Sequence, residues 1–384
     1  MFPIADYREA ERRAHAHLDN WRVAQAHSVD WFARVGFPVR IESPHEVGQL
    51  LDTMQEGRFE AFMEETQGLP PEDLSLLVRA LVSSILFQMQ WLPLRQPTLP
   101  LSTMMSSLLL YRKMRGFDAG FRRVLEVGPG CGYLSFFLRQ HAALENYTQT
   151  EACESFYALQ SMIDRHLFGG LFVDDVHAPE SRNVYTGLTQ DRDAAVPLDR
   201  ELLGEPKCYH YPWWSLDRVL ARRDYFDIVT ANANLNEMSR AALRDYLALF
   251  RRVLAPAGIF LVQCTGAEGH GTLSDLLGIL AEARFAPVFC AFAGNVKFAT
   301  AKGRVTRQLC LNNIVMVREG NPLFDQCYGR RNFYSGYMLQ TPWLDRMYFA
   351  PSGSMYTRRQ VVTLVETALT ELVAAGRQLP EFPC

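Results

Sequence analysis

The feature that most constrains the fold is a short apolar segment that runs directly into three regularly spaced glycines. Residues 124–127 are followed by Gly128, Gly130 and Gly132, at every second position. Glycine tolerates positive φ and lacks a Cβ, so a ligand can approach its backbone closely. A helix expected over residues 133–139 would direct the free N–H groups of its first turn at that ligand. The pattern predicts a buried strand, a tight turn and a helix around a small-molecule site.

Polar residues at the ends of later strand-like segments narrow the class of fold. Residues 146–150 read as a second strand that ends in Glu151, nineteen residues after the last glycine of the turn. An acid about twenty residues beyond such a turn, at the tip of the next parallel strand, is well placed to hold ribose hydroxyls. A further strand-like segment ends in Asn232, and Ser239 is expected to cap the helix that follows it. The alternation of strands and helices over residues 121–320 predicts a doubly wound sheet.

The order of these elements resembles that of the class I S-adenosylmethionine-dependent methyltransferases. The form Glu-x-Gly-x-Gly-x-Gly, which runs from Glu126 to Gly132, fits that class better than the dinucleotide fingerprint, whose third glycine falls one position later. Residues 124–134, 210–214 and 230–238 are similar to the bacterial sugar O-methyltransferase family. The resemblance implies a Rossmann-like α/β fold with a doubly wound seven-stranded sheet, its last strand antiparallel, and S-adenosyl-L-methionine as the cofactor.

The regions that flank this sheet predict three domains. Residues 1–120 read as almost entirely helical and are expected to form an N-terminal cap or lid. Residues 121–320 are expected to form the S-adenosylmethionine-binding Rossmann-like catalytic domain, with residues 169–206 as an insertion. Residues 321–384 are expected to form a C-terminal extension that contains a helix over residues 357–375. Within the catalytic domain, the last two strands are expected over residues 285–292 and 310–317, as an antiparallel pair.

Composition excludes several classes of partner. A net charge of −3 and a pI near 6.3 argue against nucleic acid, whose binding proteins usually carry a basic field. The eight cysteines show no Cys-x-x-Cys pair and no Cys/His ligand spacing, which indicates a cytoplasmic, reducing environment and no metal site. The most apolar stretch, residues 74–94, is interrupted by polar residues and predicts a buried helix without any membrane span. The expected partner is a small-molecule acceptor, and the sequence leaves a homodimer open.

The glycine turn supplies the first group of cofactor residues. Gly128, Gly130 and Gly132 are expected to admit the methionine and adenosine parts of the cofactor. Tyr133 begins the helix behind them and joins the cofactor-binding candidates. Glu126 is expected to organise the turn and to face the cofactor amino group.

The tips of the neighbouring strands supply the second group. Glu151 is expected to bind the ribose hydroxyls. Trp213, in a Pro-Trp-Trp sequence, is a candidate wall for a flat adenine slot, although adjacent tryptophans also fill protein cores. Asn232 and Asn234 alternate, so one is expected to face the cofactor and the other to have a capping or turn role.

Methyl transfer requires alignment of donor and acceptor and the removal of one proton. Three residues near strand ends are candidates for the base: Glu237, His270 and His210. Each residue also has a plain structural interpretation. Glu237 can be a glutamate near a helix start, and His210 and His270 can be surface histidines.

The expected activity is methylation of a small molecule, on a hydroxyl of a sugar or of another secondary metabolite. Amino-group methylases place Pro-Pro-aromatic after the asparagine, whereas residues 232–235 here read Asn-Ala-Asn-Leu, which disfavours an exocyclic base nitrogen. Two alternatives stay open. The protein could cleave S-adenosylmethionine as a cyclase or lyase that releases methylthioadenosine, or it could be an inactive, cofactor-binding partner subunit.

Overall fold

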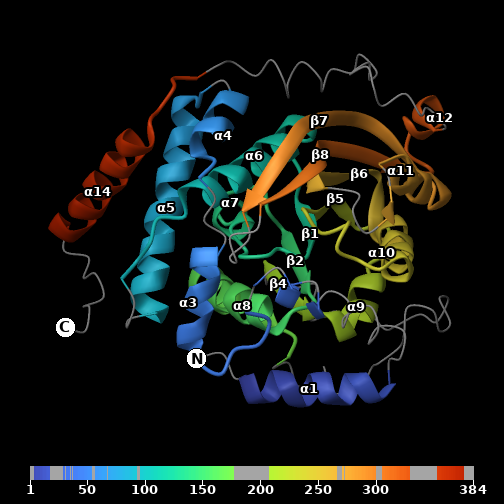
Figure 1. Cartoon of the computed structure of the whole chain (residues 1–384), viewed down its shortest axis with the longest axis horizontal. Coiled ribbons are helices and arrows are strands. Elements are labelled where there is room, and N and C mark those ends of the chain that lie inside the picture. The colour runs from blue at the N-terminus through green and yellow to red at the C-terminus, as the bar shows by residue number, and fades with distance from the viewer. Residues whose placement is uncertain are drawn as a thin grey trace.

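A parallel sheet forms around β1 (Arg123–Val127), the apolar segment that precedes the three glycines (Figure 1). β1 pairs with β2 (Asn146–Glu151) on one side and with β5 (Phe226–Ala231) on the other, so the strand order reverses at β1. The structure is a computed structural model. It describes residues 4–17, 29–30, 32–34, 36, 38–53, 57–66, 68–92, 96–176, 207–265, 270–271, 273–299, 305–328 and 353–375.

The described strands form one eight-stranded sheet in the order β3-β4-β2-β1-β5-β6-β8-β7. Among the described strands β8, the last one, runs antiparallel to both of its neighbours, β6 and β7, and the other pairs are parallel, so the doubly wound α/β fold and its antiparallel last strand are confirmed. The expected count of seven strands is wrong, because residues 172–174 of the expected insertion pair with β4 as an edge strand. The remaining strands are β3 (Phe172–Asp174), β4 (Cys208–Pro212), β6 (Leu254–Thr265), β7 (Phe285–Ala299) and β8 (Val305–Arg318).

The last two strands pair antiparallel as expected, and they are longer than the sequence indicates. β7 and β8 are paired from Phe285 and Arg318 to Ala299 and Val305. β6 pairs with β8 only as far as Leu311, so the hairpin continues beyond the end of β6.

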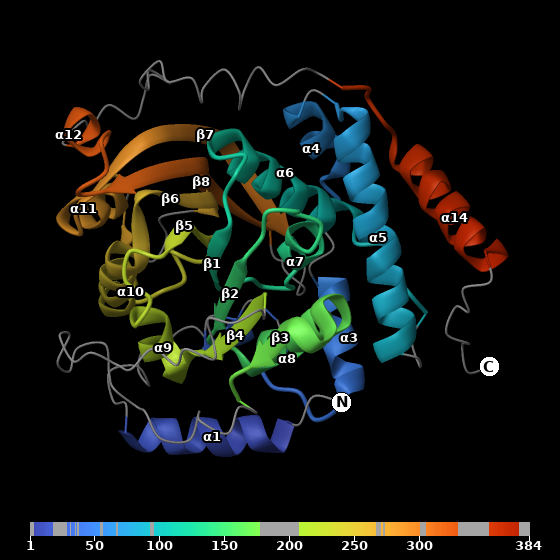
Figure 2. The same ribbon diagram turned by 180° about the vertical axis from the view of Figure 1, so that it is seen from behind.

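Helices cover both faces of the sheet (Figures 1 and 2). α7 (Leu134–Leu138) and α8 (Glu154–Phe168) lie on one face, and α9 (Leu216–Leu220) and α10 (Arg240–Val253) lie on the other. The structure also describes the α-helices labelled α1 (Ile4–His17), α3 (Pro44–Thr53), α4 (Phe59–Glu65), α5 (Pro71–Trp91), α6 (Leu101–Phe117), α11 (Leu273–Glu282), α12 (Phe324–Cys327) and α14 (Arg358–Ala374).

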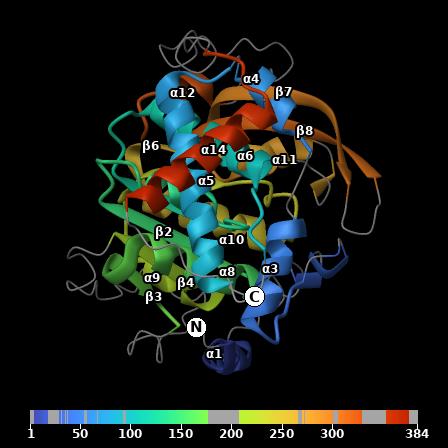
Figure 3. The ribbon, with the colours of Figure 1, turned by 90° about the vertical axis from the view of Figure 1, so that its left-hand side faces the viewer.

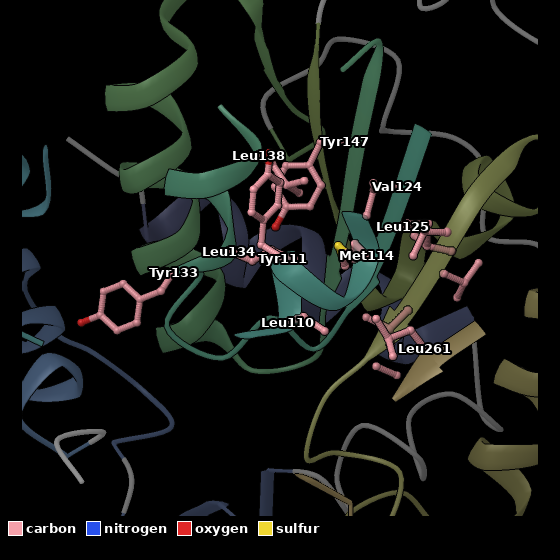
Figure 4. Packing of buried hydrophobic residues seen from close by; sticks show 14 of the residues in the cluster. Leu110, Tyr111, Met114, Val124, Leu125, Tyr133, Leu134, Leu138, Tyr147 and Leu261 are labelled. Atoms are coloured by element: carbon pink, nitrogen blue, oxygen red, sulfur yellow. The ribbon is translucent and has the colours of Figure 1, made fainter. Parts of the chain in front are cut away.

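The N-terminal helices share the core of the sheet. Leu110 and Met114 of α6 pack with Val124 and Leu125 of β1 and with Leu134 of α7, and all five side chains are buried (Figure 4). Full burial of an aliphatic side chain of this size contributes roughly 1.5–3 kcal/mol. The contact fixes α6 beside the strand whose end carries the glycine turn.

α5 and α14 pack against one another at one side of the molecule (Figure 3). Among the described residues, α5 is the one helix long and apolar enough to cross a membrane, a test that buried core helices also pass. The apolar spacing of α5 predicts an inward face, and its members Leu77 and Leu81 are buried. The same spacing in α14 predicts that Val361, Leu364 and Val365 point inward. Val361 and Val365 are buried, but the prediction for Leu364 is wrong, since that side chain is 38% exposed.

The predicted role of Ser239 as the N-cap of α10 can be tested directly by mutation. Ser239 Oγ accepts a hydrogen bond of 3.1 Å from Ala242 N. Replacing Ser239 by Ala leaves that N–H without its acceptor, and we expect the free energy of unfolding in urea to fall by about 1 kcal/mol. Ser239→Asp, which keeps a capping oxygen, should stay close to the wild type; equal losses in both variants would contradict the cap.

Candidate active site

The three glycines form a tight turn in the left-handed region of backbone space. Gly128, Gly130 and Gly132 have φ values of 62°, 60° and 71°. A Cβ on Gly128 would lie 2.4 Å from Asn234 Nδ2, and one on Gly132 would lie 3.1 Å from Gln160 Cγ. At Gly128 the backbone conformation and the close neighbour therefore both favour glycine, and at Gly130 and Gly132 the backbone conformation alone favours it.

The turn lies at the edge of the sheet where α/β folds bind ligands. Open parallel sheets bind ligands outside the carboxyl ends of their strands, where the strand order reverses. Here β1 occupies that place, with β2 and β5 beside it. A cavity of about 180 Å³ opens at this edge. The described residues that line it are Arg58, Phe62, Ser102, Thr103, Ser106, Ser107, Leu110, Glu126, Gly128, Pro129, Gly130, Leu134, Asn232, Ala233 and Gln263.

A larger cavity of about 440 Å³ lies at the opposite edge of the sheet. Its lining includes Asp224, two residues before the start of β5, and Arg318, the last residue of the antiparallel β8. Those positions mark the amino-terminal edge of the parallel strands. The glycine turn and the strand tips are remote from it, so we assign the candidate site to the smaller cavity.

Glu126 is a buried acid at the wall of this cavity. Its carboxyl accepts a hydrogen bond from the Tyr147 hydroxyl and also bonds to the Asn232 side chain. Burial raises the pKa of Glu126 to about 8, and these two hydrogen bonds oppose the rise. The group therefore holds a proton near neutral pH and can exchange it for a cationic ligand.

Glu151, the expected ribose ligand, is buried at the end of β2. Its Oε1 accepts from Ala152 N at 2.7 Å and from Cys153 N at 3.0 Å, and its Oε2 accepts from Gln160 Nε2 at 3.0 Å. A carboxylate has about four acceptor positions, so one remains for a further donor. Gln160 also donates to Gly130 O at 2.6 Å and thereby joins Glu151 to the glycine turn. Gln160 was not identified from the sequence.

The two alternating asparagines have different surroundings. Asn232 lines the cavity, and its Oδ1 accepts from Gln263 N at 3.1 Å. Asn234 is turned toward the backbone, where its Nδ2 donates to Val127 O at 2.5 Å. Asn232 thus faces the cavity, and Asn234 holds the end of β1.

Four of the expected cofactor residues lie outside the described cavity lining: Gly132, Tyr133, Glu151 and Trp213. Trp213 follows β4 and is 1% exposed, with its ring 5.2 Å from that of His15. Its Nε1 and the Thr150 Oγ1 at the end of β2 are buried without a hydrogen-bond partner among the described residues. Tyr133 is the N-cap residue of α7 and is also buried, and in Figure 4 its ring points away from the other labelled side chains.

The structure does not bring the three candidate bases to the cavity. His210 is fully buried, with Nδ1 2.9 Å from Ser161 Oγ and its ring stacked on Tyr157 at 3.8 Å. Burial holds its pKa well below the usual value, so it stays neutral inside the fold. His270 Nε2 bonds to Leu235 O at 2.7 Å. Glu237 lies in the turn before α10 and is absent from the described lining.

The N-terminal cap covers the part of the edge where Glu151 lies. Glu154 begins α8, and its carboxylate accepts hydrogen bonds of 3.0 Å from Arg8 Nε, 2.6 Å from Arg40 Nη1 and 3.1 Å from Ile41 N. Although burial works against the charge, these donors hold the pKa of Glu154 below its usual value. Cys153 Sγ also lies 3.4 Å from Val39 O. We call the contact of Arg8 and Arg40 with Glu154 the cap latch.

The other wall of the cavity was not identified from the sequence. Gln263, at the end of β6, donates from Nε2 to Ser106 Oγ at 3.0 Å and accepts at Oε1 from Lys113 Nζ at 3.0 Å. Hydroxyls recur along α6 with the spacing of one helix face, which is a signal that the sequence does carry. They are Ser102, Thr103, Ser106 and Ser107.

No cluster of three or more metal-ligating side chains occurs among the residues that the structure describes. The described lining of the cavity offers hydroxyls, amides, one guanidinium and one carboxyl group.

Comparison with known proteins gives only distant structural matches. No protein-family model matches the chain, and no curated protein matches it. The [4+2]-cyclase SpnF is 17% identical with a TM-score of 0.33, over 50% of this chain and 61% of that one, so the chain spans about three fifths of its length. The magnesium protoporphyrin IX methyltransferase from Synechocystis PCC 6803 with bound SAM is 11% identical, with a TM-score of 0.35 over 64% of this chain and 97% of that one. Geranyl diphosphate methyltransferase in complex with SAM is 10% identical, with a TM-score of 0.35 over 57% and 87%. Similarities of this size carry no weight for activity.

The raised pKa of Glu126 predicts a pH-dependent contribution to stability. Between its usual value of 4.5 and about 8, the unfolded chain has lost the proton that the folded chain keeps. The free energy of unfolding should therefore fall by about 1.4 kcal/mol per pH unit through this interval, a few kcal/mol in all. Above the interval this contribution should level off. In Glu126→Gln the loss of stability between pH 5 and pH 8, measured by urea unfolding, should be smaller by a few kcal/mol, while other buried acids whose pKa is raised, such as Asp164, keep their share of the slope. Parallel curves for the two proteins would show that Glu126 ionises normally.

Proposed function

We propose that the protein is an S-adenosylmethionine-dependent methyltransferase that acts on a small molecule in the cytoplasm. The observation that carries this proposal is the turn of three left-handed glycines beside Glu126, at the point where the strand order reverses. The low net charge and the lack of a basic field favour a small acceptor over nucleic acid. A hydroxyl of a sugar or secondary metabolite is the acceptor that the sequence resemblance favours.

The residues at the strand ends fit the cofactor in chemistry. When bound, the cofactor supplies an electrophilic methyl group on a sulfonium. Glu126 would bind the ammonium group, and Gly128 and Gly130 would leave room for the methionine part against the backbone. Glu151 would accept from a ribose hydroxyl at its remaining position. The unpartnered buried Nε1 of Trp213 would gain an acceptor, since a buried donor without one is costly.

The cap has to move before the whole cofactor can enter. Small-molecule pockets usually measure about 300–1,000 Å³, and the open cavity of about 180 Å³ is below that range. The missing volume lies on the Glu151 side, where α1 and the segment over residues 38–51 pack on the strand ends. The closed cap would exclude water from the transfer site once the cofactor is bound.

Cofactor binding provides the direct test of the proposed site. Labelled S-adenosylmethionine should bind the wild type with micromolar affinity by equilibrium dialysis. Gly130→Val should remove binding because a branched side chain at φ 60° distorts the turn. Glu151→Ala should remove it by deleting the ribose acceptor. Undiminished binding by both variants would refute the site, and methylthioadenosine formed from the cofactor alone would favour the cyclase alternative.

Weakening the cap latch should speed cofactor entry. Arg8→Met deletes two charge-assisted hydrogen bonds to Glu154. Discounted for the partial exposure of Arg8, the loss of about 1.4 kcal/mol would make the open state about tenfold more populated. We expect stopped-flow tryptophan fluorescence to show S-adenosylhomocysteine associating about tenfold faster. Arg12→Met, which removes an exposed pair with Glu9 on the same helix, is the matched control. Equal rates in all three proteins would mean that the latch does not limit entry.

A further inference from the structure

The cavity has two chemically different walls. One wall carries Glu126 and the glycine turn, which the proposed function assigns to the cofactor. The other wall carries Arg58, at the N-cap of α4, and the hydroxyls of α6. The Arg58 guanidinium lies 4.8 Å over the Phe62 ring, and Arg58 N donates to Ser102 Oγ at 3.2 Å. Arg58 is thereby fixed at the entrance to α6.

The second wall suits an anionic group. Among the described lining residues, Arg58 is the only cation and Glu126 the only acid. A guanidinium binds a carboxylate through two parallel hydrogen bonds, and a stacked guanidinium is already oriented for this. Serine and threonine hydroxyls on α6 add further donors beside it. Gln263 holds one of these hydroxyls, that of Ser106, at 3.0 Å.

The same lining offers little help to a neutral acceptor. An alcohol has to lose its proton as it is methylated, and a base must lie within about 2.6–3.2 Å of it or act through one water. His210, His270 and Glu237 are all missing from the described lining, and Glu126 is assigned to the cofactor ammonium. An acceptor that arrives already ionised needs no base.

We propose, on the basis of the methyltransferase function, that the acceptor is a small carboxylic acid that binds Arg58 and the α6 hydroxyls and is methylated on its carboxylate oxygen. The carboxylate oxygen forms a bond to the methyl carbon while the carbon–sulfur bond breaks, and the electron pair of that bond stays on sulfur. A methyl ester and a neutral thioether result. The two opposite charges cancel, and no proton is released.

Binding of a simple carboxylate tests this assignment without any turnover. With the wild type saturated by S-adenosylhomocysteine, calorimetry should show benzoate binding at least tenfold more tightly than benzamide, its neutral counterpart. A charge-assisted pair at Arg58 accounts for such a ratio, since tenfold corresponds to about 1.4 kcal/mol. In Arg58→Gln the preference should vanish while the affinity for S-adenosylhomocysteine stays within twofold. Arg58→Lys, which keeps the charge, should retain part of the preference and confirms that the site is folded.

Three outcomes would overturn the inference. Benzoate could bind no more tightly than benzamide. Arg58→Gln could weaken S-adenosylhomocysteine tenfold, in which case Arg58 binds the carboxylate of the cofactor itself. An alkali-stable methyl ether formed from glucose would show an alcohol acceptor, whereas a methyl ester is cleaved by mild alkali. Failure of the wild type to bind S-adenosylhomocysteine at all would refute the methyltransferase function instead.

Discussion

The site depends on a bend in the backbone that places Gly128, Gly130 and Gly132 in the left-handed region, which favours glycine. Gly128 N is bonded to Thr150 O at 2.9 Å, and Asn234 Nδ2 is bonded to Val127 O at the end of β1. Gln160 holds the next glycine through Gly130 O. Three separate elements therefore fix a turn of left-handed residues, which would be strained for any side chain with a Cβ. Rigid support of this kind is what a binding turn needs, because its geometry has to exist before the ligand arrives.

The structure keeps several acids in the core near this turn, at a cost in free energy. Burial raises the pKa of Glu126 to about 8 and that of Asp164 to about 7. Asp164 of α8 accepts a hydrogen bond of 2.5 Å from Gln149 of β2, the strand beside β1. Tyr147, also in β2, donates to Glu126. A buried carboxyl that is neutral near pH 7 gains most from a cation placed beside it. A sulfonium compound with an ammonium group would supply such a cation. The buried Glu126 lowers the stability of the protein, and the proposed binding of this cation gives a reason for its presence.

The sequence allowed the sheet and the turn to be predicted because both rest on local patterns. The glycine spacing, the acid at Glu151 and the cap at Ser239 are each readable within about twenty residues. The short strand over residues 172–174 was missed because three residues carry no periodic signal, and its pairing with β4 is a tertiary contact. The surroundings of His210 could not be predicted for a related reason: strand direction fixes its position along the sheet, but its hydrogen bond to Ser161 of α8 is a tertiary contact.

The second wall of the cavity, which carries Arg58 and the α6 hydroxyls, could not have been predicted from residues 121–320 alone. Arg58 and the α6 hydroxyls come from residues 57–117, and they line one cavity with Glu126 while Leu110 and Met114 of α6 share the buried core with β1. A Rossmann-like sheet supplies the cofactor edge in many proteins, while the acceptor wall is added by whatever covers that edge. In this chain the cover consists of helices that share the core with the sheet. Because Leu110 and Met114 share the buried core with Val124 and Leu125 of β1, a mutation that changes their packing is expected to move the α6 hydroxyls relative to Glu126.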